Sequence, residues 1–221
     1  MKIVKQMIIK LISNILYLFA LKGILFAQGL DDIQFWHAEK FQKIINDKTS
    51  LSLEQDFRSG ENMSKLLYLH ADFGFRRSLN KSYSINLNFR EVFEQKGQNL
   101  TREHRPHVQI AWKGKSGQFS ISSRARLEYR IRQGKDSVFR NRDMISLNYG
   151  KGFTSLKLVP YLANEFFYDF EKNEYNRNRF YVGIKVGSIK SFKPTIYILI
   201  QTKIANDSFT HIGVLGFKFN F

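Results

Sequence analysis

The sequence contains no cysteine and only three prolines among its 221 residues. The absence of cysteine excludes a disulfide scaffold, a thiolate zinc site, a cysteine nucleophile and a lipid-anchored N-terminal cysteine. With 14 glycines, the chain is also too poor in proline and glycine to be collagen-like or a low-complexity sequence. Acidic residues are scarce, 19 against 35 Lys and Arg, and the formal net charge is +16. The 21 Phe and 10 Tyr argue against a disordered basic tail.

Residues 1–27 have the layout of a secretory signal peptide. Lysines precede a short apolar stretch at residues 11–21, and Ala27 is the small residue before the expected cut. The alternative, a membrane-anchor helix, is disfavoured because Lys22 interrupts the apolar run, and a spanning helix needs about 20 apolar residues. We therefore expect residues 1–27 to be removed on export, and residues 28–221 to form one domain.

The rest of the sequence alternates between apolar and polar residues with period two. Between residues 119 and 132 the odd positions are apolar, Ser123 excepted, and the even positions are polar and mostly cationic. A strand sends successive side chains to opposite faces, so this pattern predicts β-structure. Short clusters of Gly, Asn, Asp and Ser separate the runs and predict antiparallel hairpins. Eleven candidate strands begin near Ile33, Ser50, Lys65, Ser82, Glu103, Gln118, Phe139, Ser155, Arg177, Thr195 and Phe209.

Alternation alone does not separate a soluble barrel from a membrane barrel, whose apolar face is turned outward to lipid. Three features favour the membrane version. The polar positions mix Arg, Ser, Asn, Asp, Glu and Gly, which suits a hydrated lumen. The chain stops on an alternating aromatic segment, formed by Phe217, Phe219 and Phe221. Aromatic residues near strand ends suit the interfacial girdles of such barrels, and here they are Trp36, Trp112, Tyr149, Tyr161 and Tyr168.

The sequence thus predicts an all-β fold, a single antiparallel transmembrane β-barrel. Bacterial single-chain barrels have an even number of strands, so eleven candidates imply one strand too few or one too many. Residues 28–221 leave enough chain for 12 spanning strands with their turns, and also for 10. We expect 12 strands and keep 10 as the alternative.

The C-terminal aromatic pattern resembles the sorting signal of outer-membrane barrels, carried here by Phe217, Phe219 and Phe221. Residues 34–221 also resemble the Gram-negative outer-membrane β-barrel family catalogued as domain of unknown function 2490. That resemblance implies an outer-membrane location, contact with membrane lipid and lipopolysaccharide, and insertion by the barrel assembly machinery; it implies no activity. It is carried by Phe35-Trp36 and by residues 51–58, 102–105, 140–142 and 160–168.

Arginines dominate the polar positions of the candidate strands. If that face lines a lumen, the interior is net positive, and rings of Arg and Lys favour anions in a pore. Two alternatives stay open: carboxylates pair with the cations and close the lumen, or the outer cations bind lipopolysaccharide phosphates. The candidate anion-facing residues are Arg76, Arg90, Arg124, Arg126, Arg130, Arg132, Arg142 and Arg179, and the candidate lumen carboxylates are Glu54, Asp56, Asp72 and Glu128.

The leading interpretation is therefore a narrow passive channel or binding barrel for small anionic solutes. A structural, envelope-organising barrel with a closed lumen is the alternative. A lipid-modifying enzyme is disfavoured, because none of the five histidines has a serine two residues away to activate. Metal binding is disfavoured because His104 and His107 are three apart and would face opposite sides of a strand. We expect no cofactor, and the dispersed basic residues form no nucleic-acid module.

Overall fold

The computed structural model describes residues 29–187, 192–205 and 208–221. The expected signal peptide, residues 1–27, lies outside these described residues. No helix long and apolar enough to cross a membrane occurs in the described part of the chain. Residues Asp32–Phe221 form one compact unit.

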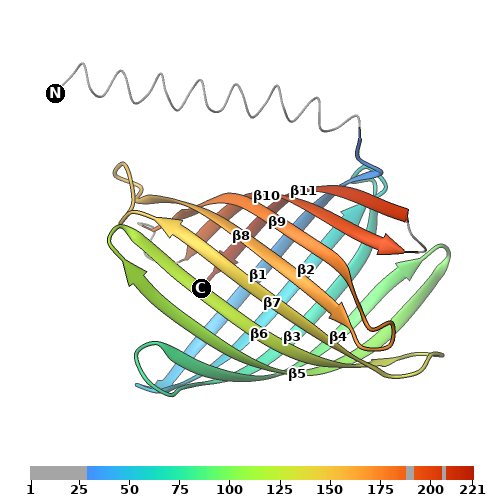
Figure 1. Ribbon diagram of the computed structural model, residues 1–221, viewed down its shortest axis with the longest axis horizontal. Helices are drawn as coiled ribbons and strands as arrows, with labels where there is room; N and C mark the ends of the chain where they lie inside the picture. Colours follow the sequence, from blue (N-terminus) through green and yellow to red (C-terminus); the bar gives the residue numbers. More distant parts are fainter. Residues whose placement is uncertain (1–28, 188–191, 206–207) are drawn as a thin grey trace. The chain divides into compact units, whose positions relative to one another are not determined.

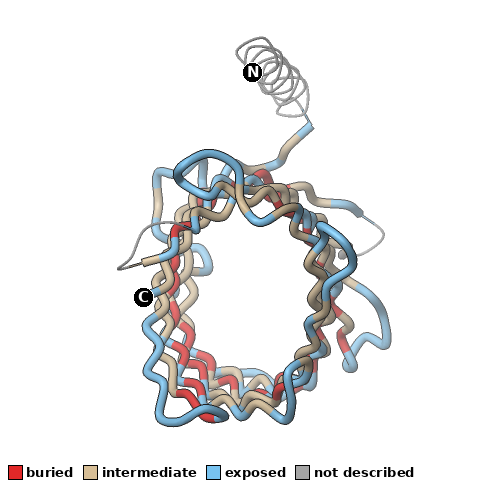
Figure 2. Tube along the Cα trace, turned by 90° about the vertical axis from the view of Figure 1, so that its left-hand side faces the viewer, coloured by how far each residue is buried: buried red, intermediate tan, exposed pale blue. Residues whose placement is uncertain are grey.

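Eleven strands in the described residues make a single closed barrel (Figures 1 and 2). Each strand pairs with its sequence neighbours in antiparallel fashion, and the barrel closes where the first and last strands pair in parallel. The strands are β1 (Asp32–Asn46), β2 (Thr49–Gly60), β3 (Lys65–Ser78), β4 (Tyr83–Lys96), β5 (Asn99–Ser116), β6 (Phe119–Arg132), β7 (Val138–Tyr149), β8 (Leu158–Asp169), β9 (Glu174–Val186), β10 (Lys193–Ala205) and β11 (Ser208–Asn220).

The expectation of 12 strands, with 10 as the alternative, is wrong for this structure. Every candidate strand is present and begins within four residues of its predicted start. The even-number rule failed because it assumes that the first and last strands run in opposite directions. Here β1 and β11 run the same way, with Asp32 beside Ile212 and Lys40 beside Asn220, so an odd number of strands closes the barrel. The start of β1 and the end of β11 consequently lie at opposite ends of the barrel (Figure 1).

The apolar side chains face outward and the ionic side chains face the lumen. On β6, Leu127 is 39% exposed, whereas its neighbour Glu128 is fully buried inside the barrel. Cross-strand pairs carry this alternation round the barrel, since Leu127 lies opposite Val108 on β5 and Glu128 opposite Arg140 on β7. An apolar exterior around an ionic interior is the arrangement of a barrel in lipid and the reverse of a soluble one.

One wall of the lumen is apolar. Leu199 on β10, Ile212 and Val214 on β11, and Trp36 on β1 form a small buried cluster inside the barrel. Gly216 permits this packing because a Cβ atom there would lie 2.1 Å from the ring of Tyr197.

The expected aromatic girdle is wrong for two of its five residues. Trp36 and Tyr161 are buried and line the lumen, because both occupy inward positions of their strands. Trp112 lies opposite the exposed Tyr83 on the outer surface, and Tyr149 is 40% exposed there. Tyr168 also lies on the outer surface, where its ring contacts the exposed rings of Phe170 and Tyr175.

The three C-terminal phenylalanines lie on the outer face across the parallel seam between β11 and β1. The ring of Phe217 is 5.7 Å from Phe35, and that of Phe221 stacks on Phe41 at 4.8 Å. The backbone N–H of Phe221 donates to the carbonyl oxygen of Lys40 at 2.8 Å. These residues therefore help to close the barrel; their role as a sorting signal stays a prediction.

The outward orientation of Leu127 predicts that a charge there hinders insertion into lipid. We expect Leu127→Arg to cost about 2–4 kcal/mol if the residue lies near the midplane of the membrane. The matched change Arg126→Leu, one residue away on the luminal face, should cost less, because Glu128 keeps its contacts with Arg140 and Arg142. The folded fraction of each variant is measured by its heat-modifiable gel mobility after folding into vesicles. Equal tolerance of both substitutions would mean that the two faces are reversed.

Candidate functional site

The lumen contains two cavities, one of about 380 Å³ and one of about 170 Å³. Five residues line both cavities and mark the level at which they meet; we call them the central ring. Each belongs to a different strand, so the ring is assembled from around the barrel. Its members are Trp36 (β1), Arg58 (β2), Arg90 (β4), Arg142 (β7) and Arg179 (β9).

Cation–π contacts and ion pairs hold the central ring together. The guanidinium groups of Arg58 and Arg179 lie 3.8 and 4.7 Å from the ring of Trp36. Arg58 Nε donates to Asp56 at 2.6 Å, and Arg90 Nε donates to Asp72 at 2.7 Å. Guanidinium groups stack readily on aromatic faces and bind carboxylates in a fixed geometry, so the ring residues are held in place.

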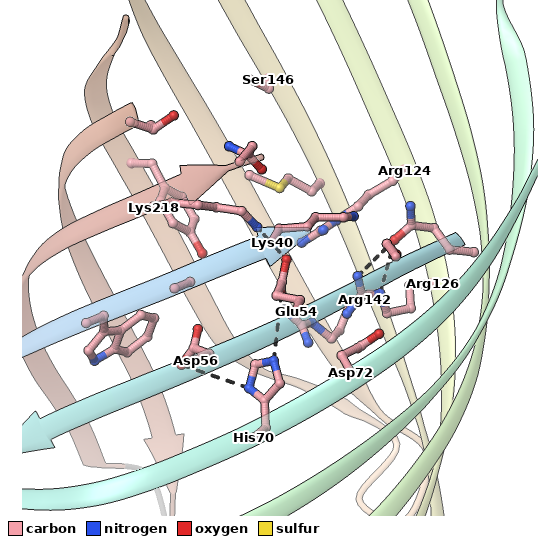
Figure 3. Close-up of a pocket in the computed structure, with 18 of the residues that line it drawn as sticks. Lys40, Glu54, Asp56, His70, Asp72, Arg124, Arg126, Arg142, Ser146 and Lys218 are labelled. Atoms are coloured by element: carbon pink, nitrogen blue, oxygen red, sulfur yellow. Dashed lines mark hydrogen bonds and ion pairs between the residues drawn. The ribbon is translucent and has the colours of Figure 1, made fainter. Parts of the chain in front are cut away.

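Carboxylates on β2 and β3 supply the acidic part of the larger cavity (Figure 3). Glu54 accepts a 2.6 Å bond from Lys218, which joins β2 to β11 over the intervening strand β1. His70 on β3 lies between Glu54 and Asp56, with its ring nitrogens 3.7 and 3.9 Å from their oxygens. Against three carboxylates, nine Arg and Lys side chains line this cavity, so its wall is basic on balance.

Two fully buried glutamates are the centres of the ionic packing. Glu128 accepts bonds from Arg140 at 2.5 Å and from Arg142 at 2.8 Å. Glu165 accepts bonds from Arg124 at 2.5 Å and from Arg142 at 2.8 Å. Arg142 therefore bridges both carboxylates. Buried carboxylates are tolerated only with close counter-charges and good hydrogen bonds, and both conditions are met here.

The smaller cavity is more strongly basic. Nine of its seventeen lining residues are Arg or Lys, and Glu94 is the single carboxylate among them. Glu103 is buried but does not line this cavity. It accepts hydrogen bonds from two residues that do, Arg105 at 2.9 Å and Arg130 at 2.7 Å. Phe167, only 1% exposed, lies between four guanidinium groups at 4.7–5.4 Å from its ring; they belong to Arg140, Arg142, Arg177 and Arg179.

The twelve residues predicted to face the lumen do not form one site. Arg90, Arg124, Arg126, Arg142 and Arg179 line the larger cavity together with Glu54, Asp56 and Asp72. Arg130 lines the smaller cavity. Glu128 is buried in the barrel interior. Arg76 and Arg132 line neither cavity, and Arg132 donates instead to the backbone oxygen of Asp136 and to Glu171.

The prediction from the sequence missed several residues of the cavities and of the neighbouring ion clusters. Period-two alternation through residues 99–116 and 158–169 would have placed four of them, Glu103, Arg105, Glu165 and Phe167, on the inner face. Their importance arises from cross-strand contacts, which a single strand does not reveal. The missed residues are Trp36, Glu103, Arg105, Arg140, Glu165, Phe167 and Arg177.

The histidines divide between the two faces. His70 and His107 are buried inside the barrel, whereas the neighbouring His104 lies outside and bonds to Glu91 at 2.6 Å. His104 and His107 thus lie on opposite faces. Neither His70 nor His107 has a hydrogen bond to a serine. No group of three or more His, Cys, Asp or Glu side chains that could hold a metal ion occurs within the described residues.

The contacts of Glu165 predict that its charge stabilises the barrel. We expect Glu165→Gln to cost about 3–5 kcal/mol, because it leaves the buried Arg142 and Arg179 with one carboxylate fewer. The control Glu61→Gln removes an exposed pair with Lys65 and should cost at most about 1 kcal/mol. Urea unfolding in lipid vesicles measures the free energy of unfolding of both variants. A Glu165→Gln variant as stable as the control would contradict a structural role for this ion cluster.

The comparisons with known proteins give a family and a solved structure. A NanC porin, crystallised in a rhombohedral form, aligns with a TM-score of 0.48 and 10% sequence identity, over 80% of this chain and 91% of that one. No curated protein matches the chain. The model of the family described as a protein of unknown function, DUF2490, matches residues 33–209. Because that match spans well over half of the sequence, the chain belongs to the DUF2490 family.

Proposed function

We propose that this protein is a transmembrane barrel of the outer membrane and that it admits small anionic solutes, as a narrow passive channel or a binding barrel. The observation that carries the proposal is the excess of basic side chains on the walls of both cavities. Nine basic residues face three carboxylates in the larger cavity, and nine face one in the smaller. Such a lumen attracts anions and repels cations, and fixed positive charge is how anion pores select.

The outward apolar face supports the location in a membrane. Large apolar side chains remain exposed on every strand, among them Phe89 at 48% on β4 and Ile198 at 59% on β10. In water this surface would far exceed the patches that soluble monomers expose. The same proposal includes export through the segment at residues 1–27. It also includes contact with lipopolysaccharide and insertion by the barrel assembly machinery.

The central ring makes the passage narrow. Its five side chains project from five strands into the level where the two cavities meet, and four of them are arginines. A small solute would pass or bind by exchanging contacts with these guanidinium groups. Small barrels are readily filled by side chains, and only small solutes fit what remains.

The rival function is a structural barrel with a closed lumen, and a specific observation favours it. Glu128 and Glu165 are fully buried and tie β6, β7, β8 and β9 together through ion pairs. Packing of this kind holds a lumen shut if the surplus cations are also immobilised. No catalytic residue is assigned, and we propose that the protein is not an enzyme.

The two functions differ in the current that reconstituted protein carries. In a planar bilayer with a salt gradient, we expect a reversal potential that shows anion preference. Lys40→Glu and Lys185→Glu, both in the wall of the larger cavity, should shift that preference toward cations. The matched changes are Lys48→Glu, in a turn, and Lys115→Glu, near the end of β5; neither residue lines a cavity, so both should shift it much less. Absence of current from all five proteins would favour the closed barrel.

A further inference from the structure

We propose that the smaller cavity binds a doubly charged tetrahedral oxyanion, either free phosphate or the phosphoryl group of a small ester. This inference rests on the proposed function, since it names the class of anion that the lumen takes. It concerns one end of the lumen, where Arg177 on β9 and Lys203 on β10 line the cavity.

Arg177 and Lys203 are a like-charge pair, and Glu94, the one carboxylate in the wall of this cavity, attracts both without forming an ion pair with either. They lie directly opposite each other in the register of β9 and β10, where like charges destabilise a sheet. Among the described residues, neither forms an ion pair with a carboxylate. Arg177 Nε is buried and has no hydrogen-bond partner. Two adjacent cations without an ion-paired carboxylate therefore line the cavity, and an anion bound there would neutralise them.

The remaining cations of this cavity have other partners. Arg105 and Arg130 share Glu103, Arg140 binds Glu128, and Arg179 Nε donates to Gln201. The contact of Arg177 with Phe167, at 5.3 Å from the ring, orients the guanidinium without neutralising it. The unmatched charge is thus concentrated at Arg177 and Lys203.

Size and charge select the ligand. The cavity of about 170 Å³ is less than half the size of the larger one and has room for a tetrahedral oxyanion. Two unmatched cations suit a dianion better than chloride or a carboxylate. The planar guanidinium of Arg177 matches two oxygens of a phosphate, and the ammonium of Lys203 adds a point charge. Gln201, 3% exposed, adds an amide donor to the same wall.

Trp36 gives a direct readout of binding. The chain has two tryptophans, so Trp112→Phe leaves Trp36, which lines the smaller cavity, as the only one. Inorganic phosphate is titrated into this variant in detergent, at constant ionic strength and at a pH at which phosphate is doubly charged. We expect a saturable fluorescence change with phosphate and with sulfate, and none with chloride or acetate at equal concentration.

In the Trp112→Phe background, Arg177→Gln and Lys203→Gln should each weaken phosphate binding about tenfold or more, because each removes a charge-assisted contact. Lys172→Gln is the matched control, since it removes one cation from the exposed turn before β9, outside the cavity. Heat-modifiable mobility establishes that each variant is folded. Competition by glycerol phosphate would identify the phosphoryl group of a small ester as the ligand, and its absence would identify the free oxyanion.

The inference is overturned if phosphate and sulfate give no saturable change, or if the Arg177→Gln and Lys172→Gln variants bind phosphate equally well. Its failure is separable from that of the proposed function. A barrel that binds phosphate but passes no current keeps this site and loses the channel. A barrel with an anion-selective current and no response of Trp36 keeps the channel and loses the site.

Discussion

The structure depends on matching buried guanidinium groups with buried carboxylates. Arg142 bridges Glu128 and Glu165, which are both fully buried, and thereby connects β6, β7 and β8 in the middle of the barrel. Charged groups that are removed from water are stable only when their counter-charges are close. These ion pairs therefore constrain the positions of the strands that carry them. The central ring is held by the same principle, because Asp56 and Asp72 fix two of its arginines.

The matching is incomplete, and the proposed function rests on the surplus positive charge. The buried Glu128 and Glu165 pair with arginines, but the walls of the two cavities keep an excess of basic side chains. Arg177 and Lys203 lie opposite each other, and within the described residues neither forms an ion pair with a carboxylate. A protein selected only for a packed interior would gain stability from a carboxylate at such a position. An uncompensated basic wall is instead the arrangement expected where an anion is the missing partner.

The sequence predicted the strands and their facing but not the contacts between them. Period two located all eleven strands, because one face of each is apolar and the other ionic. The expected number of 12 strands was wrong, because it followed from the rule that barrels have an even number of strands. The parallel pairing of β1 with β11 lets an odd number close the barrel. Trp36 was expected at the outer rim because aromatic residues near strand ends are typical of interfacial girdles, although it occupies an inward position of its strand. Glu165 was overlooked, since its three arginine partners come from β6, β7 and β9 and meet only when the barrel closes.

The basic character of the lumen can be measured directly, because the chain has no cysteine of its own. Single-cysteine variants at Ser146, in the larger cavity, and at Gln34, in the smaller one, would be treated with negatively and positively charged thiol reagents of equal size. The ratio of the two reaction rates, normalised to a cysteine at the exposed Lys48, reports the local potential. We predict that the negatively charged reagent reacts faster at both luminal positions and that added salt reduces the difference. Equal rates, or faster reaction of the positively charged reagent, would contradict a lumen that attracts anions.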